Sequence, residues 1–443
     1  MNSIAQISIF DYIETENLGD LKRLKIFFEN IDDNTLCERL EKSRKNGRND
    51  YPIRTMLNLI YAMKIFGHRN VESFRRELSR NSQLRIVCGL SEGKYKYLKD
   101  RKHLVPPARV FTGILTKLID YQDELDNIFK KLVDFMYENL EGFGEDCAVD
   151  GKYLDTYGKN FRKNKCNDRR AEHDATSSCK TYIMKDGSKK SEWHYGFRAH
   201  IICDANYGLP LKYKVTPANN SEQIELNNML EDMEENEKYK LNKMVNLLAD
   251  AGYDNGKRNK KLKEEYNINP IIDIKHMWSK DEEYREIENQ MLAYNQEGEV
   301  FFITDDNKYE KLKYLGYDRK NNCLRYTRAN TGNNVFRISL DIDNRIFTPV
   351  ARDSKKFKNL YKKRTEVERL NGRIDRDYMF NDHFIRGLSK MNLMLSISFI
   401  IMLTLAKGHI KNKRKSIRGL VAWFLKKVIH IYRIFMPFFR KKY

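Results

Sequence analysis

The chain has 443 residues, of which 41% are hydrophobic and 12% aromatic, and it carries a formal net charge of +20. This hydrophobic content excludes a disordered chain, and the length is enough for two or three domains around a substantial core. The basic excess indicates a polyanionic partner, either a nucleic acid or an acidic membrane surface. A lysine-rich soluble protein without such a partner is the plainer alternative.

The cysteines and the apolar segments indicate the compartment. The seven cysteines are scattered and include no Cys-x-x-Cys pair, which argues against a disulfide framework and a zinc ribbon. The first residues lack a basic stretch followed by an apolar core, so we expect no signal peptide. The apolar segment 391–406 is short for a membrane span and predicts a buried core helix. We therefore expect a cytoplasmic protein with no membrane partner.

Residues 1–140 are expected to form an all-α N-terminal domain. Pro52 stands where a helix would begin, and the residues after it give that helix a broad apolar face. Further helices are expected over 71–78, over 84–87 and after Pro107. Arginines on their outer faces fit a domain for DNA binding or dimerisation, and an ordinary helical bundle explains the same pattern about equally well.

From residue 141 onwards the pattern predicts an α/β domain. Runs of β-branched and aromatic residues predict strands, and amphipathic runs between the later ones predict helices, which together give a mixed sheet. The expected strands are 147–150, 195–203, 209–215, 245–249 and 270–274, and the expected helices are 222–233 and 257–266.

Two segments interrupt this domain, and a basic segment follows it. Residues 158–192 are basic and lack periodicity, so we expect a surface loop that follows a DNA backbone. Residues 278–350 predict a β-rich insertion. The catalytic domain is therefore expected in two parts, 141–277 and 351–406. The tail, 407–443, has twelve Lys or Arg residues and no Asp or Glu, which suits contact with phosphates.

Two aspartates follow apolar runs that are expected to be strands. Asp150 closes the run 147–149, and Asp250 closes the run 245–249. Two carboxylates at strand ends and one carboxylate on a helix can form an oxygen-rich cage for two Mg²⁺ ions, and such a cage supports phosphodiester chemistry. Taken one at a time, each carboxylate is more simply a solvated charge or half of a surface ion pair.

The third carboxylate is expected on a helix that contains residues 361–368. Tyr361, Arg364 and Glu368 are three and then four residues apart, so they share one stripe of that helix. Glu366 competes for the role, but two residues along a helix differ by about 200°, so it points away from the stripe and we select Glu368. A structural ion pair of Arg364 with Glu368 across one turn is the alternative.

These motifs resemble those of bacterial insertion-sequence transposases of the DDE type, whose catalytic domain is similar to ribonuclease H. The most specific matches are Asp250-Ala251-Gly252-Tyr253-Asp254 and the helix with the Tyr-Arg-Glu signature. Further matches lie at 51–57, 73–78, 149–151, 194–200 and 215–219. The resemblance covers most of the chain. It implies an α/β fold with a ribonuclease H-like mixed sheet and a β-rich insertion, preceded by an all-α N-terminal domain.

The resemblance also implies an activity. The protein would bind the terminal inverted repeats of its element, cleave DNA strands there and transfer them to target DNA by a cut-and-paste route. Asp150, Asp250 and Glu368 would be the catalytic and metal-binding residues, holding two Mg²⁺ ions for which Mn²⁺ can substitute. Tyr361 and Arg364 would contact phosphates near the scissile bond. The expected partners are double-stranded DNA and a second copy of the chain, as a homodimer on DNA at the bacterial nucleoid.

The chain departs from the family pattern at one position. The family usually has a lysine seven residues after the glutamate, where this chain has Asp375, so the flanking Arg373 and Arg376 are the candidates to contact DNA in its place. In related transposases an aromatic residue of the insertion stacks on a flipped base, which makes Trp278 the candidate here, although a Trp is more often buried. Two alternatives remain open, namely a non-catalytic DNA-binding protein derived from a transposase and a Mg²⁺-dependent nuclease without strand transfer.

Overall fold

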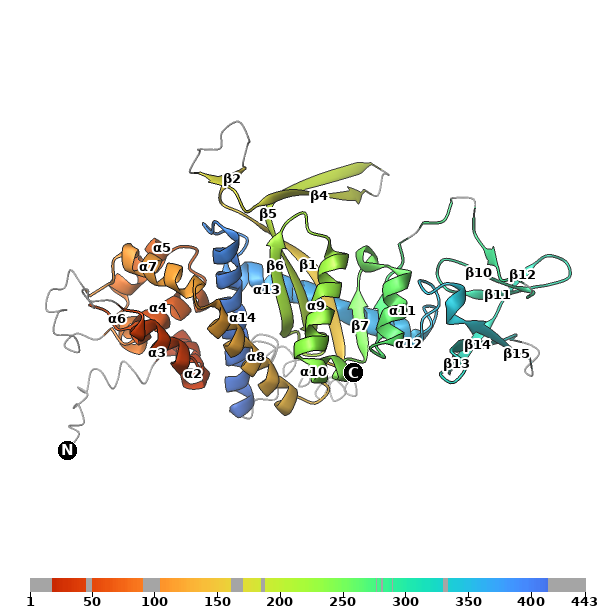
Figure 1. Ribbon diagram of the computed structural model, residues 1–443, viewed down its shortest axis with the longest axis horizontal. Coiled ribbons are helices and arrows are strands. Elements are labelled where there is room, and N and C mark those ends of the chain that lie inside the picture. Colours follow the sequence, from red (N-terminus) through yellow and green to blue (C-terminus); the bar gives the residue numbers. More distant parts are fainter. Residues whose placement is uncertain are drawn as a thin grey trace, which may run out of the picture. The chain divides into compact units, whose positions relative to one another are not determined.

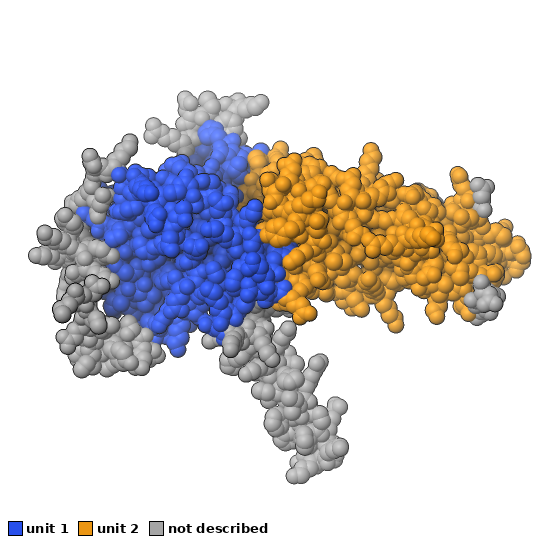
Figure 2. Space-filling model, turned by 60° about the horizontal axis from the view of Figure 1, so that its bottom comes forward, with its two compact units in different colours: residues 1–140, 153–197, 371–443 blue, residues 141–152, 198–370 orange. Residues whose placement is uncertain are grey.

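The computed structural model describes residues 18–44, 50–90, 104–160, 170–184, 188–275, 277–279, 282–288, 290–329 and 334–412 (Figure 1). The chain divides into two compact units, coloured separately in Figure 2. The first unit comprises residues 1–140, 153–197 and 371–443, and the second comprises 141–152 and 198–370. Each unit therefore combines segments that are far apart in the sequence.

The first unit is mainly helical, which confirms the expected all-α N-terminal region. Its helices from the N-terminal region are α2 Lys22–Asn30, α3 Asn34–Lys42, α4 Ile53–Ile65, α5 Val71–Arg80, α6 Ser82–Cys88, α7 Ala108–Ile119 and α8 Gln122–Asn139. Pro52 precedes the first residue of α4 with extended backbone, as expected from the sequence. Asn70 and Asn81 cap α5 and α6 by accepting backbone N–H bonds from Ser73 and Leu84.

The helix expected over 391–406 is α14, Leu388–Lys411. It packs against α2, α4, α7 and α8 and lies in the same compact unit as these N-terminal helices. The predicted domain boundary at 406/407 falls inside it. By length and composition α14 could cross a membrane, but 72% of its most apolar window is buried within the protein, as in the core helix of a soluble protein. Residues 413–443 of the basic tail lie outside the described residues.

The central sheet is mixed, as expected. Its strands are β1 Asp146–Asp155, β4 Thr176–Ile183, β5 Lys189–Asp204, β6 Pro210–Pro217, β7 Asn246–Ala249 and β8 Asn269–Ile272. They follow the order β4-β5-β1-β7-β8, with β6 also paired to β5. Strands β1, β7 and β8 are parallel, whereas β4 and β5 are antiparallel. The helices α9 Glu222–Asn236, α10 Lys238–Lys243 and α11 Gly256–Glu264 connect β6 to β7 and β7 to β8.

The segment expected as a basic loop, 158–192, contains strands instead. The short strands β2 Lys159–Asn160 and β3 Ala171–Glu172 pair in parallel, and β4 pairs with β5 from Thr176↔Gly196 to Ile183↔Lys189. The prediction of a loop was wrong here because the ribbon buries little on either face, so its residues show no alternation of apolar and polar side chains. Trp193 illustrates this exposure, with 72% of its surface accessible to solvent.

The β-rich insertion expected over 278–350 is present as two small antiparallel sheets. One has the order β12-β11-β10-β9 and the other β13-β14-β15. Their strands are β9 Arg285–Glu286, β10 Leu292–Tyr294, β11 Val300–Ile303, β12 Tyr309–Lys311, β13 Lys313–Asp318, β14 Cys323–Thr327 and β15 Val335–Ser339. Both sheets contribute to one apolar cluster, in which Val300 and Tyr326 are fully buried.

Candidate active site

Asp150 lies on β1, and Asp250 directly follows β7, the neighbouring parallel strand of the second unit. The register of β1 and β7 pairs Cys147 with Leu247 and Ala148 with Leu248, so two residues further along the two aspartates are directly opposite each other. Neighbouring strands are about 4.8 Å apart, which brings both half-buried carboxylates to the same edge of the sheet. Asp250 also caps the following 3-10 helix, because its Oδ1 accepts the Gly252 N–H at 2.8 Å.

The Tyr-Arg-Glu segment is helical throughout but is not a single α-helix. Helix α12, Lys355–Tyr361, ends at the tyrosine, a 3-10 turn covers Lys362–Arg364, and α13, Thr365–Tyr378, carries the glutamate. In a 3-10 turn residues three apart are eclipsed, and the Arg364 guanidinium accordingly lies 5.6 Å from the centre of the Tyr361 ring. The Arg364 Nη2 donates to Glu368 Oε1 at 2.6 Å. The predicted stripe of three side chains is therefore present in spite of the change in helix type.

The charge of Asp250 acts on both Arg364 and Tyr361 of the Tyr-Arg-Glu segment. Burial lowers the pKa of Arg364, but the neighbouring Tyr361, Glu368 and Asp250 outweigh burial and leave the pKa above its ordinary value. Burial, followed by the Asp273 carboxylate, raises the pKa of Tyr361 to about 12, and Asp250 adds to the increase. The second aspartate, the arginine and the tyrosine thus share one electrostatic environment.

The two competing glutamates differ in their surroundings. Glu366 is buried, with 8% of its surface exposed, and it accepts a hydrogen bond from Arg369 on the same helix. Glu368 has half of its side chain exposed and faces Arg364. The contacts of Glu368 are therefore also those of the structural alternative, an ion pair across one turn.

The donor set suits a hard divalent ion, because carboxylate oxygens are the ligands that Mg²⁺ and Mn²⁺ prefer. Asp150 and Asp250 fit by position as well as by type, since they face each other across adjacent strands. Among the described residues, however, no three His, Cys, Asp or Glu side chains are grouped closely enough to hold a metal ion. Glu368 would join the two aspartates by exchanging its contact with Arg364 for the ion.

The other predicted DNA-binding residues, Arg373, Arg376 and Trp278, differ in their exposure and in their contacts. Arg373 is half-buried, and Arg376 is exposed and paired with its neighbour Asp377 at 2.7 Å. Both belong to the first unit, as does Asp375, whereas the three carboxylates belong to the second. Trp278 is half-buried, packs edge-on against Tyr294 and is covered by the Arg285 guanidinium at 4.2 Å. These contacts match the alternative of a packed Trp, and its stacking on a base stays a prediction.

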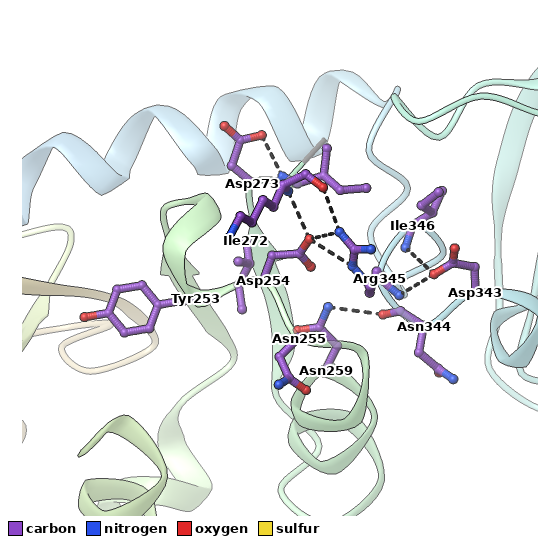
Figure 3. A network of polar contacts seen from close by, with 12 residues as sticks. Tyr253, Asp254, Asn255, Asn259, Ile272, Asp273, Asp343, Asn344, Arg345 and Ile346 are labelled. Atoms are coloured by element: carbon purple, nitrogen blue, oxygen red, sulfur yellow. Dashed lines mark hydrogen bonds and ion pairs between the residues drawn. The ribbon is translucent and has the colours of Figure 1, made fainter. Parts of the chain in front are cut away.

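Asp254, the last residue of the Asp250–Asp254 motif, has a buried and paired side chain. Its Oδ2 accepts from Arg345 Nη2 at 2.5 Å and from the Lys275 N–H at 3.0 Å (Figure 3). The same guanidinium donates to the Lys275 carbonyl, and Asn259 donates to the Asn344 carbonyl at 3.1 Å. This network ties the loop after β7 to the C-terminal end of the insertion, so Asp254 has a structural role beside the candidate site.

Three further polar residues at the site were missed from the sequence. Asp273 directly follows β8, and its Oδ2 accepts from the Tyr361 hydroxyl at 3.3 Å. Glu222 is the first residue of α9 and forms an ion pair with Arg198 of β5 at 3.2 Å. Asp273 could have been found by the same signal as the two catalytic aspartates, since it closes an apolar strand. Glu222 and Arg198 carry no such signal.

Two known protein families match this chain. Residues 142–404 match the family described as transposase DDE domain, and residues 10–105 match a second family described as transposase domain (DUF772). The first match spans more than half of the chain, so the protein belongs to the DDE transposase family, with the ribonuclease H-like fold that this family implies. The two matches together identify it as an insertion-sequence transposase of the DDE type.

Proposed function

We propose that this transposase binds the terminal inverted repeats of its own element as a homodimer on double-stranded DNA, cleaves strands there and joins them to target DNA by a cut-and-paste route. The observation that carries the proposal is the pair Asp150 and Asp250, opposite each other on parallel strands, with the Arg364–Glu368 pair beside Asp250. Transposition takes place where bacterial DNA is, in the cytoplasm at the nucleoid.

The side chains have distinct roles in this proposal. Asp150, Asp250 and Glu368 would hold two Mg²⁺ ions, or Mn²⁺ in their place, which supply an activated nucleophile and neutralise charge on the leaving oxygen. When Glu368 exchanges its contact with Arg364 for the ion, the N–H groups of Arg364 become available to donate to a phosphate near the scissile bond. The Tyr361 hydroxyl stays protonated at neutral pH because its pKa is about 12, so it can donate as well. Arg373, Arg376 and Trp278 would contact DNA further from the reacting atoms.

The test is Mg²⁺-dependent cleavage of DNA that carries the element's own ends. Asp150→Asn, Asp250→Asn and Glu368→Gln are each expected to reduce cleavage by at least about a thousandfold, because charge stabilisation is the main source of catalysis in phosphoryl transfer. Glu366→Gln is the matched control, since it makes the same change two residues away on α13 and is expected to retain cleavage. Wild-type cleavage in Asp250→Asn would refute the assignment.

Asp375 favours a second candidate, the non-catalytic DNA-binding protein. That candidate would bind the element's ends in wild-type and variant forms alike, and none of them would cleave. Cleavage by the wild type without any joined product would instead identify a nuclease that lacks strand transfer.

A further inference from the structure

The carboxylate of Glu222 lies directly against the backbone at both catalytic aspartates. A Cβ atom on Gly151, the residue after Asp150, would lie 2.9 Å from the Glu222 Cδ, a distance that real Cβ atoms essentially never show. A Cβ on Gly252 would lie 3.6 Å from Glu222 Oε2 and 2.9 Å from Asp250 Oδ1. The carboxylates of Glu222 and Asp250 therefore both lie within 3.6 Å of one point. Gly151, directly after Asp150, therefore leaves the space that Glu222 occupies, while Gly252, two residues after Asp250, is at ordinary contact distance from its carboxylate.

Arg198 holds the Glu222 carboxylate in this position. Its Nη1 lies 3.2 Å from Glu222 Oε1 and also donates to the Asn220 carbonyl at 3.3 Å, immediately before α9. Only 8% of the arginine is exposed, so the guanidinium is fixed on β5 beneath the start of the helix. A glutamate in the first turn of a helix is also favoured by the helix dipole. The ion pair with Arg198 and the helix dipole explain why the Glu222 side chain is held in place. Neither interaction requires its carboxylate to lie against Gly151.

A buried hydroxyl provides an independent observation at the same place. Tyr253 is 0% exposed, and its hydroxyl has no hydrogen-bond partner within the described part of the chain. Its ring points away from the network around Asp254 (Figure 3). Burial raises the pKa of this hydroxyl well above its usual value, and the charges that raise it further are those of Glu222, Asp150 and Asp250. A buried, unpaired phenol in the electrostatic environment of three carboxylates is suited to donate to a water or to a carboxylate oxygen that a bound cation orders.

We infer that Glu222 is a fourth carboxylate of the divalent-cation site, placed by Arg198 and by the space that Gly151 leaves. The inference rests on the proposed function, because it adds a residue to the site formed by Asp150, Asp250 and Glu368. An additional carboxylate increases the negative charge available to the cation, and tighter cation binding is the expected effect.

The experiment measures binding of Mn²⁺ alone to the full-length protein by calorimetric titration, without DNA. Glu222→Gln is expected to weaken Mn²⁺ binding by roughly 10-fold to 100-fold, as changes at supporting residues of metal sites do. Glu225→Gln is the matched control. It makes the same change one turn later on α9, where the glutamate pairs with Lys214 at 2.8 Å, and it is expected to leave Mn²⁺ affinity unchanged. Asp250→Asn is expected to lose Mn²⁺ binding at this site.

The outcomes separate this inference from the proposed function. Wild-type Mn²⁺ affinity in Glu222→Gln, with binding lost in Asp250→Asn, would overturn the inference and leave the proposed function intact. Wild-type affinity in Asp250→Asn would instead count against the proposed site as a whole. If Glu222→Gln fails to fold, Glu222→Asp keeps the charge with a shorter reach, and it is expected to bind Mn²⁺ more weakly than the wild type. Equal affinity in this variant would also refute the inference.

Discussion

Lys64 places an ammonium group inside the helical unit, where only 3% of the residue is exposed. Its Nζ donates to the Tyr378 carbonyl at 2.9 Å and lies 4.5 Å from the centre of the Phe380 ring. Within the described part of the chain no carboxylate is paired with Lys64, and burial lowers the pKa of Lys64 to about 7. One hydrogen bond and a ring face do not offset the cost of removing the charge from water.

This lowered pKa predicts a pH dependence of stability. Between pH 7 and about 10.5 the unfolded chain keeps the lysine proton and the folded chain has released it, so the free energy of unfolding rises with pH in that window. One proton accounts for at most about 1.4 kcal/mol per pH unit. Denaturant unfolding at pH 7 and 8.5 should show this rise in the wild type and a smaller one in Lys64→Met. Identical pH profiles for the two proteins would exclude the effect.

His383 is a second buried group with a lowered pKa, but it affects stability in a lower pH range than Lys64 does. Burial lowers the pKa of this histidine to about 4, so its contribution rises between pH 4 and its ordinary value near 6.5 and is complete above that. His383→Gln is therefore expected to change the unfolding profile below pH 6.5 and to keep the wild-type slope between pH 7 and 8.5.

At the residue scale, the sequence was sufficient where a functional side chain follows a recognisable element. Asp150 and Asp250 were predicted because each closes an apolar strand, and the parallel register then places them opposite each other. Glu222 was not predicted, since a glutamate in the first turn of a helix is common and its position depends on how α9 lies against Gly151. Packing of that kind is set by the whole fold and leaves no mark in the local pattern.

At the scale of elements, two glycines within helices test how closely α14 packs. Gly408 lies where α14 meets α2, and a methyl group there would overlap the Ile26 side chain and approach Asn30 Nδ2 to 3.1 Å. Gly113, inside α7, has no atom within 4 Å of its Cβ position. Gly408→Ala is expected to lower the free energy of unfolding by about 1–3 kcal/mol through overpacking. Gly113→Ala is expected to raise it by up to about 1 kcal/mol, because alanine favours the helix.

Thermal and denaturant unfolding of the two alanine variants measures this difference. Equal effects of both substitutions would show that α14 does not lie tightly against α2. The pair also tests the grouping of α14 with the N-terminal helices, which differs from the domain order predicted from the sequence. That order followed the chain, whereas the apolar surface of α14 is covered by four helices from the first 140 residues.

The strands that bury apolar side chains were easier to predict from the sequence than the exposed ones. Strand β7 is buried throughout and β1 over its first four residues, and their apolar runs located both ends of β7 and the start of β1 to within one residue. Strand β4 and the first residues of β5 were mistaken for a loop, because polar residues line most of their exposed length, whereas the buried part of β5 was predicted as the strand 195–203. The change from α-helix to 3-10 turn at Lys362–Arg364 also has no counterpart in the sequence pattern, although it preserves the spacing of the Tyr-Arg-Glu stripe.

At the scale of the whole molecule, the dominant property is the charge of +20. A protein that neutralises phosphates releases counterions, so its DNA affinity falls with salt at a slope of about 0.9 for each phosphate contacted. Much of the excess is local, because residues 383–443 contain no Asp or Glu. In the N-terminal helices, by contrast, Arg75 and Arg80 are each paired with a glutamate three residues earlier. The unbalanced tail is therefore the better candidate for phosphate contacts.

This uneven charge predicts which substitutions change the salt dependence of DNA binding. Neutralising Lys413, Arg414 and Lys415 together with glutamine should reduce the slope of log K against log salt by up to about 3, as expected for the loss of up to three contacts. The matched control neutralises three exposed lysines of the β-rich insertion, Lys308, Lys313 and Lys320, and therefore lowers the net charge equally. Fluorescence anisotropy with a labelled duplex measures the slope of each variant. The salt concentration is varied from about 50 to about 300 mM, the range over which such slopes are commonly determined. A smaller slope in the tail variant alone indicates direct phosphate contacts, because an effect of net charge would act on both variants. Equal slopes in the tail variant and the wild type would place the phosphate contacts elsewhere on the chain.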